Sequence, residues 1–284
     1  MTDNNSFTGF NPIFEDSPPD KNFPATMSPL LFFNGKSKLF GTMFIASGEK
    51  NKPTVLMLNG FPGNETNHDI ARMLQRFGFN VMGFNYSGSW GSGGSYSFAN
   101  ILSDTEAALD FLMNDQCREK FRVDPNKIIL LGYSMGGFSA LYNSIKYDSI
   151  KNIIAIAPFN AGMFGQILES NKEIKSYSVS QMIDAMNFVN NESAEDLLNE
   201  MIENKSDWNL LNHLKSLELK NILLFGAKYD SIAPLQIHHY PLSENLLKAN
   251  PNTKVHLIET GHSFSDKRIE LITIIYNWVN KVQF

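Results

Sequence analysis

The sequence contains a single cysteine, Cys117, among its 284 residues. One cysteine cannot form an internal disulfide, so the fold has to be stabilised by a hydrophobic core. This cysteine usage suits a reducing compartment, and we expect a cytoplasmic protein. Cys117 lies in the polar stretch D-Q-C-R-E-K at the end of an expected helix, where we interpret it as an incidental thiol.

Long apolar runs and an excess of basic residues are also missing. No apolar run reaches the roughly 20 residues that a membrane-spanning helix needs. The first residues, M-T-D-N-N-S-F, lack the basic and apolar segments of a secretory signal. Lys and Arg number 24 against 29 Asp and Glu, which gives a net charge of −5. This balance argues against nucleic-acid partners, because binding to phosphate backbones usually requires a basic face.

What the sequence does have is a hydrophobic content of 43%, enough for a sizeable core in a chain of this length. From Leu39 onward, short apolar runs alternate with amphipathic segments. Runs such as Thr54–Leu58, Ile128–Leu131 and Asn221–Ala227 are typical of strands buried in a parallel sheet that helices cover on both faces. The sequence therefore predicts an α/β fold with a mostly parallel, twisted sheet flanked by helices.

Two segments depart from this alternation. Residues 1–30 are polar and contain five prolines, which predicts an N-terminal arm on the surface. Residues 163–215 show no strand pattern and are rich in Asn, Glu, Lys and Ser. We predict that this second segment is a helical cap or lid, inserted between two parts of one core, residues 31–162 and 216–284.

Two helices can be given boundaries. Ser103, with Glu106 three residues later, predicts an N-cap near the start of a helix over residues 101–113. Residues 235–249 predict one continuous helix.

The most informative stretch is residues 127–138, K-I-I-L-L-G-Y-S-M-G-G-F. A buried strand ends at Gly132, a helix-competent segment follows, and Ser134 lies midway between Gly132 and Gly136. This spacing is typical of a nucleophile elbow, a turn so tight that a side chain at either glycine would clash. The elbow exposes the serine Oγ at a helix N-terminus, which favours negative charge nearby. A glycine-rich turn with a solvated serine is the alternative, and it explains the flanking strand and helix less well.

Two more residues with suitable chemistry lie just beyond strand ends. Asp230 follows the strand Asn221–Ala227, and His262 follows the strand Lys254–Ile258. Loops at the carboxyl edge of a parallel sheet converge, so we expect both residues to approach Ser134. Five other histidines lack this placement: His68, His213, His238, His239 and His256.

These three side chains form a set that nucleophilic catalysis needs. A serine hydroxyl requires a base at neutral pH, and an imidazole can serve because its usual pKa lies near neutrality. A carboxylate then fixes the imidazole tautomer and stabilises the imidazolium. We predict Ser134 as nucleophile, His262 as base and Asp230 as acid. Glu259 is the main rival acid, but it precedes His262 by only three residues on the same loop.

Two glycine-containing loops border the expected site. In the first, N-G-F-P-G-N at residues 59–64, Pro62 has no N–H, so Phe61 supplies the amide nearest Gly60 that can face an oxyanion. An ordinary strand-to-helix turn is the alternative for this loop. The second, residues 85–98, matches no phosphate-binding pattern, and we interpret it as a pocket wall. The candidate substrate-binding residues are Tyr86, Trp90, Tyr133, Met163 and Phe164.

From about Leu39 to the C-terminus, apart from the insertion, the chain resembles an α/β-hydrolase. The resemblance lies in N-G-F-P-G, F-N-Y-S-G-S-W-G-S-G-G-S, V-D-P-N-K-I-I-L-L-G-Y-S-M-G-G and A-K-Y-D-S-I-A-P. These stretches are similar to dienelactone-hydrolase-like esterases and to prolyl-oligopeptidase-like catalytic domains. The resemblance implies Ser134, Asp230 and His262 as the catalytic triad, and the amides of Phe61 and Met135 as the oxyanion hole. Asn59 stands where the family usually has histidine.

We therefore predict a serine hydrolase that needs no metal or cofactor and acts on a small or medium acyl substrate through an acyl-enzyme. A carboxylic ester is the favoured substrate. Two alternatives stay open, namely an acyl or aminoacyl peptidase or amidase on the same triad, and a non-catalytic ligand-binding protein that kept the fold. The sequence does not determine acyl-chain length, leaving group or oligomeric state.

Overall fold

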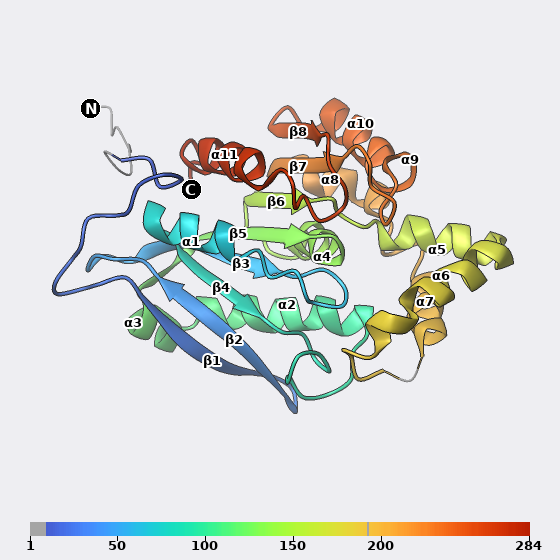
Figure 1. Cartoon of the computed structure of the whole chain (residues 1–284), viewed down its shortest axis with the longest axis horizontal. Coiled ribbons are helices and arrows are strands. Elements are labelled where there is room, and N and C mark those ends of the chain that lie inside the picture. The colour runs from blue at the N-terminus through green and yellow to red at the C-terminus, as the bar shows by residue number, and fades with distance from the viewer. Residues whose placement is uncertain (1–9, 192) are drawn as a thin grey trace.

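The computed structural model describes residues 10–191 and 193–284. Within these residues, eight strands form one sheet in the order β1-β2-β4-β3-β5-β6-β7-β8, with helices on both faces (Figure 1). This arrangement confirms the predicted α/β fold. The strands are β1 (Thr26–Asn34), β2 (Ser37–Ile45), β3 (Lys52–Leu58), β4 (Asn80–Phe84), β5 (Val123–Tyr133), β6 (Asn152–Ile156), β7 (Asn221–Ala227) and β8 (Thr253–Ile258).

The strands β3 to β8 run parallel to one another. The strand β2 is antiparallel to both of its neighbours, β1 and β4. After β3 the chain first adds β4 on one side and then β5 on the other. The loops that follow β3 and β5 therefore leave the same edge of the sheet side by side. In open α/β sheets such a reversal of strand order is where ligands bind.

Helices fill both faces because alternate residues of each buried strand point to opposite sides. Leu56 and Leu130 face one core, which the helices α2 and α4 cover, whereas Val55 and Ile129 face the other, under α1 and α11. The helices are α1 (His68–Phe77), α2 (Phe98–Met113), α3 (Asp115–Phe121), α4 (Met135–Ser144), α5 (Ala161–Ser170), α6 (Lys172–Met186), α7 (Ala194–Glu203), η1 (Leu210–His213), α8 (Leu214–Leu217), α9 (Leu235–His238), α10 (Tyr240–Ala249) and α11 (Arg268–Val279).

The strand β1 begins at Thr26, inside the segment that we expected to be an arm. It pairs with β2 along its whole length, from Thr26 opposite Ile45 to Asn34 opposite Ser37. The two strands are joined by a two-residue turn in which Gly35 has a φ of 56°. Glycine at the first position of a two-residue turn is typical of a β-hairpin, so this part of the predicted arm is wrong.

Two helix boundaries differ from the prediction. The helix α2 begins at Phe98, and its N-cap is Ser97, whose Oγ accepts from the amide of Asn100 at 3.0 Å. Ser103 is therefore not the N-cap. The predicted helix over residues 235–249 is two helices, α9 and α10, because Pro241 lacks the N–H that a continuous helix would need.

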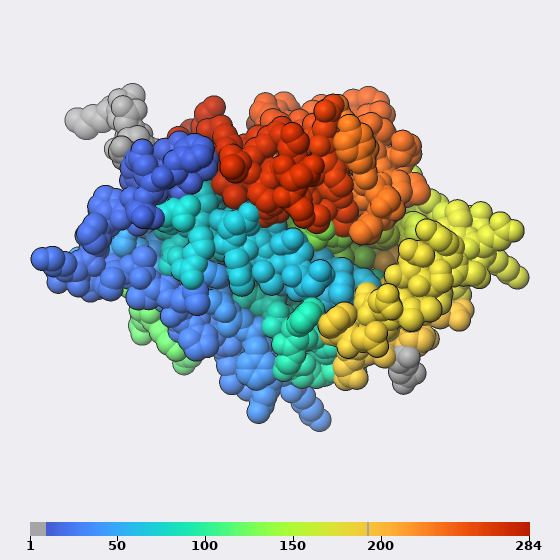
Figure 2. All heavy atoms as spheres, in the orientation of Figure 1, coloured from blue at the N-terminus to red at the C-terminus, as the bar shows by residue number. Residues whose placement is uncertain are grey.

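The segment predicted as a cap is helical where the structure describes it, and α5 to α7 extend from the carboxyl end of the sheet (Figure 1). Its division from the core at residues 163 and 215 stays a prediction. The segment contacts the loop 85–97, where Ser89 pairs with Val189 and Trp90 stacks on Phe188 at 5.2 Å between ring centroids. Figure 2 shows the yellow atoms of this segment against the teal atoms of that loop.

One carboxylate joins the helical segment to the core. Glu200 on α7 accepts hydrogen bonds from the amides of Phe98 at 2.6 Å and Ala99 at 3.0 Å. These amides belong to the first turn of α2 and have no acceptor within that helix. Burial raises the pKa of Glu200, although the two amide bonds act in the opposite direction.

Within the part of the chain that the structure describes, no helix has both the length and the apolar character needed to cross a membrane.

Replacing Glu200 with alanine should lower the free energy of unfolding by about 1–2 kcal/mol, because two amides of the first turn of α2 would lose a charged acceptor. Urea unfolding followed by circular dichroism measures the change. Glu203→Ala is the matched control, since Glu203 is on the same helix but exposed. Equal losses in the two variants would show that the bonds to α2 do not stabilise the fold.

Candidate active site

Ser134 occupies the sharp turn between β5 and α4. Its φ of 54° and ψ of −117° are unusual for a residue other than glycine. The turn depends on the glycines beside it, because a Cβ on Gly132 would lie 2.0 Å from the carbonyl oxygen of Gly136. A Cβ on Gly136 would in turn lie 2.1 Å from the carbonyl oxygen of Leu58 on β3. The backbone geometry is that of the predicted elbow.

The structure brings together the three residues that the sequence singled out. His262 Nε2 lies 2.9 Å from Ser134 Oγ, and His262 Nδ1 lies 2.7 Å from Asp230 Oδ2. Their loops follow β5, β7 and β8, so they meet at the carboxyl edge of the parallel strands. The side chains of His262 and Asp230 are 9% and 1% exposed, respectively, so bulk water has little access to the bond between them.

Backbone donors hold the Asp230 carboxylate. Its Oδ1 accepts from the amides of Ile232 at 2.9 Å and Ala233 at 2.7 Å, which leaves Oδ2 for His262. An ionised carboxylate only accepts hydrogen bonds, so His262 Nδ1 donates and Nε2 is free to accept from the serine hydroxyl. This arrangement can remove a proton from Ser134.

The rival acid, Glu259, does not share this environment. It is exposed, and its carboxylate forms an ion pair with Lys228 at 2.9 Å. That partner lowers the pKa of Glu259 through a hydrogen bond and the charge on Lys228. The position of Glu259 therefore favours a surface ion pair over contact with the imidazole.

The loop after β3 passes directly beside the serine. A Cβ on Gly60 would lie 2.9 Å from Ser134 Cβ, so only glycine lets this loop come so close. Phe61 follows Gly60, and its ring packs against Tyr96 at 5.6 Å between centroids. Met135 is the first residue of α4, where an amide has no acceptor within the helix. The oxyanion role of the Phe61 and Met135 amides stays a prediction.

The five candidate substrate-binding residues do not form one group. Tyr133 packs against the ring of His262 at 5.1 Å between centroids, and Phe164 packs against Phe159 at the same distance. Met163 is half-buried on α5, next to Phe164. Trp90 is 43% exposed and contacts the helical segment.

Tyr86 is different because it lies in the core. It is only 2% exposed and packs edge-on against Phe84 at 5.1 Å between centroids. An aromatic residue in a glycine-rich loop can face either the interior or the surface, and sequence spacing alone did not distinguish the two.

His238 lies near the site and was not among the predicted residues. Its Nδ1 accepts from the amide of Asn160 at 3.0 Å, and its ring packs against Phe159 at 4.0 Å between centroids. Its Nε2 is buried without a hydrogen-bond partner in the described residues. Burial lowers the pKa of His238 to about 3, and the charges of Asp230 and His262 act on it in opposite directions. No sequence signal marked it, because it is buried against Phe159 and Phe164, which are far from it in the chain.

Within the described residues, no three His, Cys, Asp or Glu side chains are grouped closely enough to hold a metal ion.

A mostly parallel sheet of eight strands, with a serine on the strand-to-helix elbow of β5 and α4, defines an α/β-hydrolase. The family model described as serine aminopeptidase, S33, matches residues 49–201. This match spans more than half of the sequence, and the chain belongs to that family of hydrolases.

Comparisons with individual proteins agree with this fold. An uncharacterized protein YfhR from Escherichia coli O157:H7 is 26% identical over 186 residues, which is 64% of this chain and 54% of that protein. The matched stretches span only 29% to 54% of the lengths of such curated relatives.

Two solved structures extend the comparison over nearly the whole chain. The esterase Pf2001 from Pyrococcus furiosus has a TM-score of 0.68 at 17% identity, covering 94% of this chain and 96% of that one. An acylaminoacyl peptidase from Pyrococcus horikoshii has a TM-score of 0.67 at 12% identity, covering 92% of this chain and 42% of that one. At these identities the likeness concerns the fold.

The buried histidines predict how stability depends on pH. Burial lowers the pKa of His238 to about 3 and that of His239 to about 4, below the value of about 6.5 for an unfolded histidine. The unfolded chain therefore binds more protons as the pH falls below about 6.5, and the free energy of unfolding should decrease toward pH 4. Each residue contributes at most about 1.4 kcal/mol per pH unit.

Urea unfolding between about pH 7 and pH 4.5 measures this slope. His239→Gln should reduce it, because glutamine takes up no proton. The exposed His68→Gln is the control and should leave the slope unchanged. An identical slope in wild type and His239→Gln would contradict the assignment.

Proposed function

We propose that this chain is a serine hydrolase that cleaves a small or medium acyl substrate, most readily a carboxylic ester. The observation that carries this proposal is the continuous set of hydrogen bonds from Ser134 Oγ through His262 to Asp230. Membership of the serine aminopeptidase S33 family supports it as well.

In the proposed mechanism, His262 Nε2 takes the hydroxyl proton while Ser134 Oγ attacks the carbonyl carbon. The carbonyl oxygen becomes an oxyanion, which the amides of Phe61 and Met135 would stabilise by a few kcal/mol each. His262 then gives the proton to the leaving alcohol, and an acyl-enzyme remains on Ser134. A water molecule, deprotonated by His262, attacks the acyl-enzyme, and the acid leaves as Oγ regains its proton.

The substrate side of the proposal rests on residues around this centre. Tyr133 lies against the base, and Met163 and Phe164 belong to the helical segment that extends beyond the sheet edge. We assign these residues and Trp90 to substrate contact, and residues 163–215 to a cap over the site. The burial of Tyr86 favours a structural role for that residue instead.

A peptidase or amidase on the same triad is the second candidate. The description of the family as a serine aminopeptidase favours it. No residue of this chain marks a site for a free amino terminus, so an ester remains our first choice. Hydrolysis rates for p-nitrophenyl acetate and butyrate, set against alanine p-nitroanilide, separate the two. A higher kcat/KM for the anilide would reject the ester assignment.

Ser134→Ala should abolish covalent labelling by a fluorophosphonate probe and lower kcat/KM for p-nitrophenyl butyrate by about 10⁴-fold or more, because the nucleophile is removed. The exposed Ser180→Ala, on α6, is the matched control and should label like wild type. A wild-type protein that takes no label, while folded, would favour the non-catalytic alternative.

Asp230→Asn should keep the fold but lower kcat by about 10²–10⁴-fold, because an amide no longer stabilises the imidazolium or fixes its tautomer. Steady-state kinetics on the best ester measure the effect. Glu259→Gln is the control and should stay within about twofold of wild type, since it removes only a surface ion pair. If Glu259→Gln were the more damaging change, the acid would have been assigned wrongly.

A further inference from the structure

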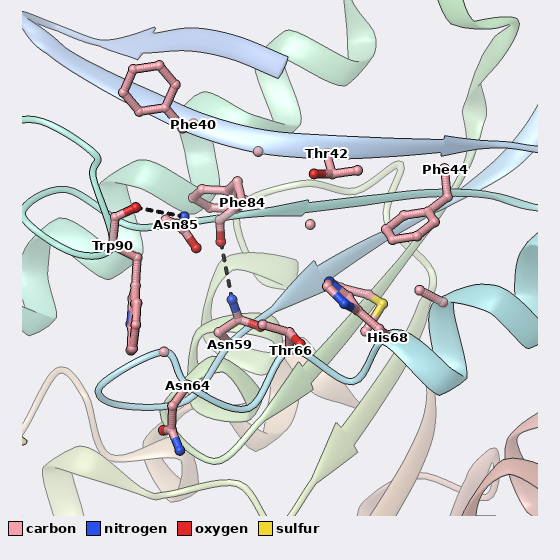
Figure 3. A pocket seen from close by; sticks show the side chains of 15 residues that line it. Phe40, Thr42, Phe44, Asn59, Asn64, Thr66, His68, Phe84, Asn85 and Trp90 are labelled. Atoms are coloured by element: carbon pink, nitrogen blue, oxygen red, sulfur yellow. Dashed lines mark hydrogen bonds between the residues drawn. The ribbon is translucent and has the colours of Figure 1, made fainter. Parts of the chain in front are cut away.

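A cavity lies beside the loop that follows β3, and Trp90 is the one residue assigned above to substrate contact that also lines it. It has a volume of about 440 Å³, is open to solvent on one side, and lies between β2, β4, the loop after β3 and the start of α1 (Figure 3). Ser134, Asp230 and His262 are not among the residues that line it. Its volume falls within the range of about 300–1,000 Å³ that is typical of small-molecule sites.

The floor of the cavity is open because it contains glycine. Gly83 on β4 lies between Thr42 on β2 and Met57 on β3, and all three line the cavity. A Cβ on Gly83 would have no atom within 4 Å, and its φ is not positive. The backbone therefore does not require glycine here, and the missing side chain leaves space above the sheet.

Aromatic rings form the two ends of the cavity. Figure 3 shows Phe40 and Trp90 at one end, and Phe44 and His68 at the other. Both ends are held in place, since Trp90 Nε1 donates to the carbonyl of Pro62 at 2.7 Å and the Phe44 and His68 rings pack edge to face at 5.6 Å between centroids. Fixed aromatic faces favour a flat ring between them.

The polar side chains that line the cavity are hydroxyls, amides and the imidazole of His68. Thr42 and Asn59 both line it, with Asn59 Nδ2 donating to the carbonyl of Phe84 at 3.3 Å (Figure 3), and no Asp, Glu, Lys or Arg is among the described residues that line it. A charged ligand would lose its hydration here without gaining an ionic partner. A ligand hydroxyl or carbonyl, by contrast, could form hydrogen bonds with these groups.

We propose that this cavity is a binding site for an uncharged aromatic compound that carries a hydroxyl or carbonyl group, a phenol being the simplest case. This proposal does not require the catalytic one, although the two share Trp90. Its occupant would contact the loop Asn59–Thr66 on the side away from Ser134, because that loop lies between the cavity and the serine.

Isothermal titration with 2-naphthol tests the proposal on the whole chain. Gly83→Met should weaken binding at least tenfold, because the new side chain begins where a Cβ meets no atom within 4 Å and would occupy the floor of the cavity. Lys254→Met, an exposed position on β8, introduces the same residue elsewhere in the sheet and should leave binding unchanged. Circular dichroism and thermal melting verify that both variants fold.

Two further measurements sharpen the result. The anion 2-naphthoate should bind at least tenfold more weakly than 2-naphthol, because no Lys or Arg is among the described residues that line the cavity. Ser134→Ala should bind 2-naphthol like wild type, which separates this site from the catalytic one. Absence of binding, equal binding by the folded Gly83→Met variant, equal affinity for the anion, or loss of binding in Ser134→Ala would each overturn the proposal.

Discussion

The candidate site depends on the direct contact between two neighbouring turns, the one that follows β3 and the one that follows β5. Gly136 is so close to Leu58 that a Cβ would lie 2.1 Å from its carbonyl oxygen, and a Cβ on Gly60 would lie 2.9 Å from Ser134 Cβ. The first is a contact between backbones and the second involves the Cβ of the serine itself, so neither turn can move without the other. Ser134 and the Phe61 loop therefore keep a fixed relation.

The charges around this contact follow from burial. The side chain of Asp230 is almost completely buried, but its carboxylate accepts hydrogen bonds from two backbone amides and from His262, which offset the loss of hydration. His238, buried nearby without such a carboxylate partner, keeps a low pKa and stays neutral. Of these two imidazoles, only that of His262 pairs with a carboxylate. Only His262 therefore has the partner that a catalytic base needs.

The parts of the fold that could be predicted are those with a local signal. Buried parallel strands showed as apolar runs, and their ends located Ser134, Asp230 and His262. The predictions that were wrong concern features without a clear local signal. The sequence predicted Ser103 as the N-cap of α2, whereas the helix begins earlier, after Ser97, and includes Phe98, which packs in the core. The strand β1 carries few buried residues, so its pairing with β2 was not evident from hydrophobicity.

By itself the sequence determined the class of sheet and the identity of the chemical groups, because strand periodicity and the Gly132–Ser134–Gly136 spacing act within a few residues. Only the tertiary structure decided that His262 Nε2 lies 2.9 Å from Ser134 Oγ and that His262 Nδ1 lies 2.7 Å from Asp230 Oδ2. It also decided that Tyr86 is buried and that Gly83 opens onto a cavity. These features depend on how strands and loops far apart in the chain align, and no local pattern records that alignment.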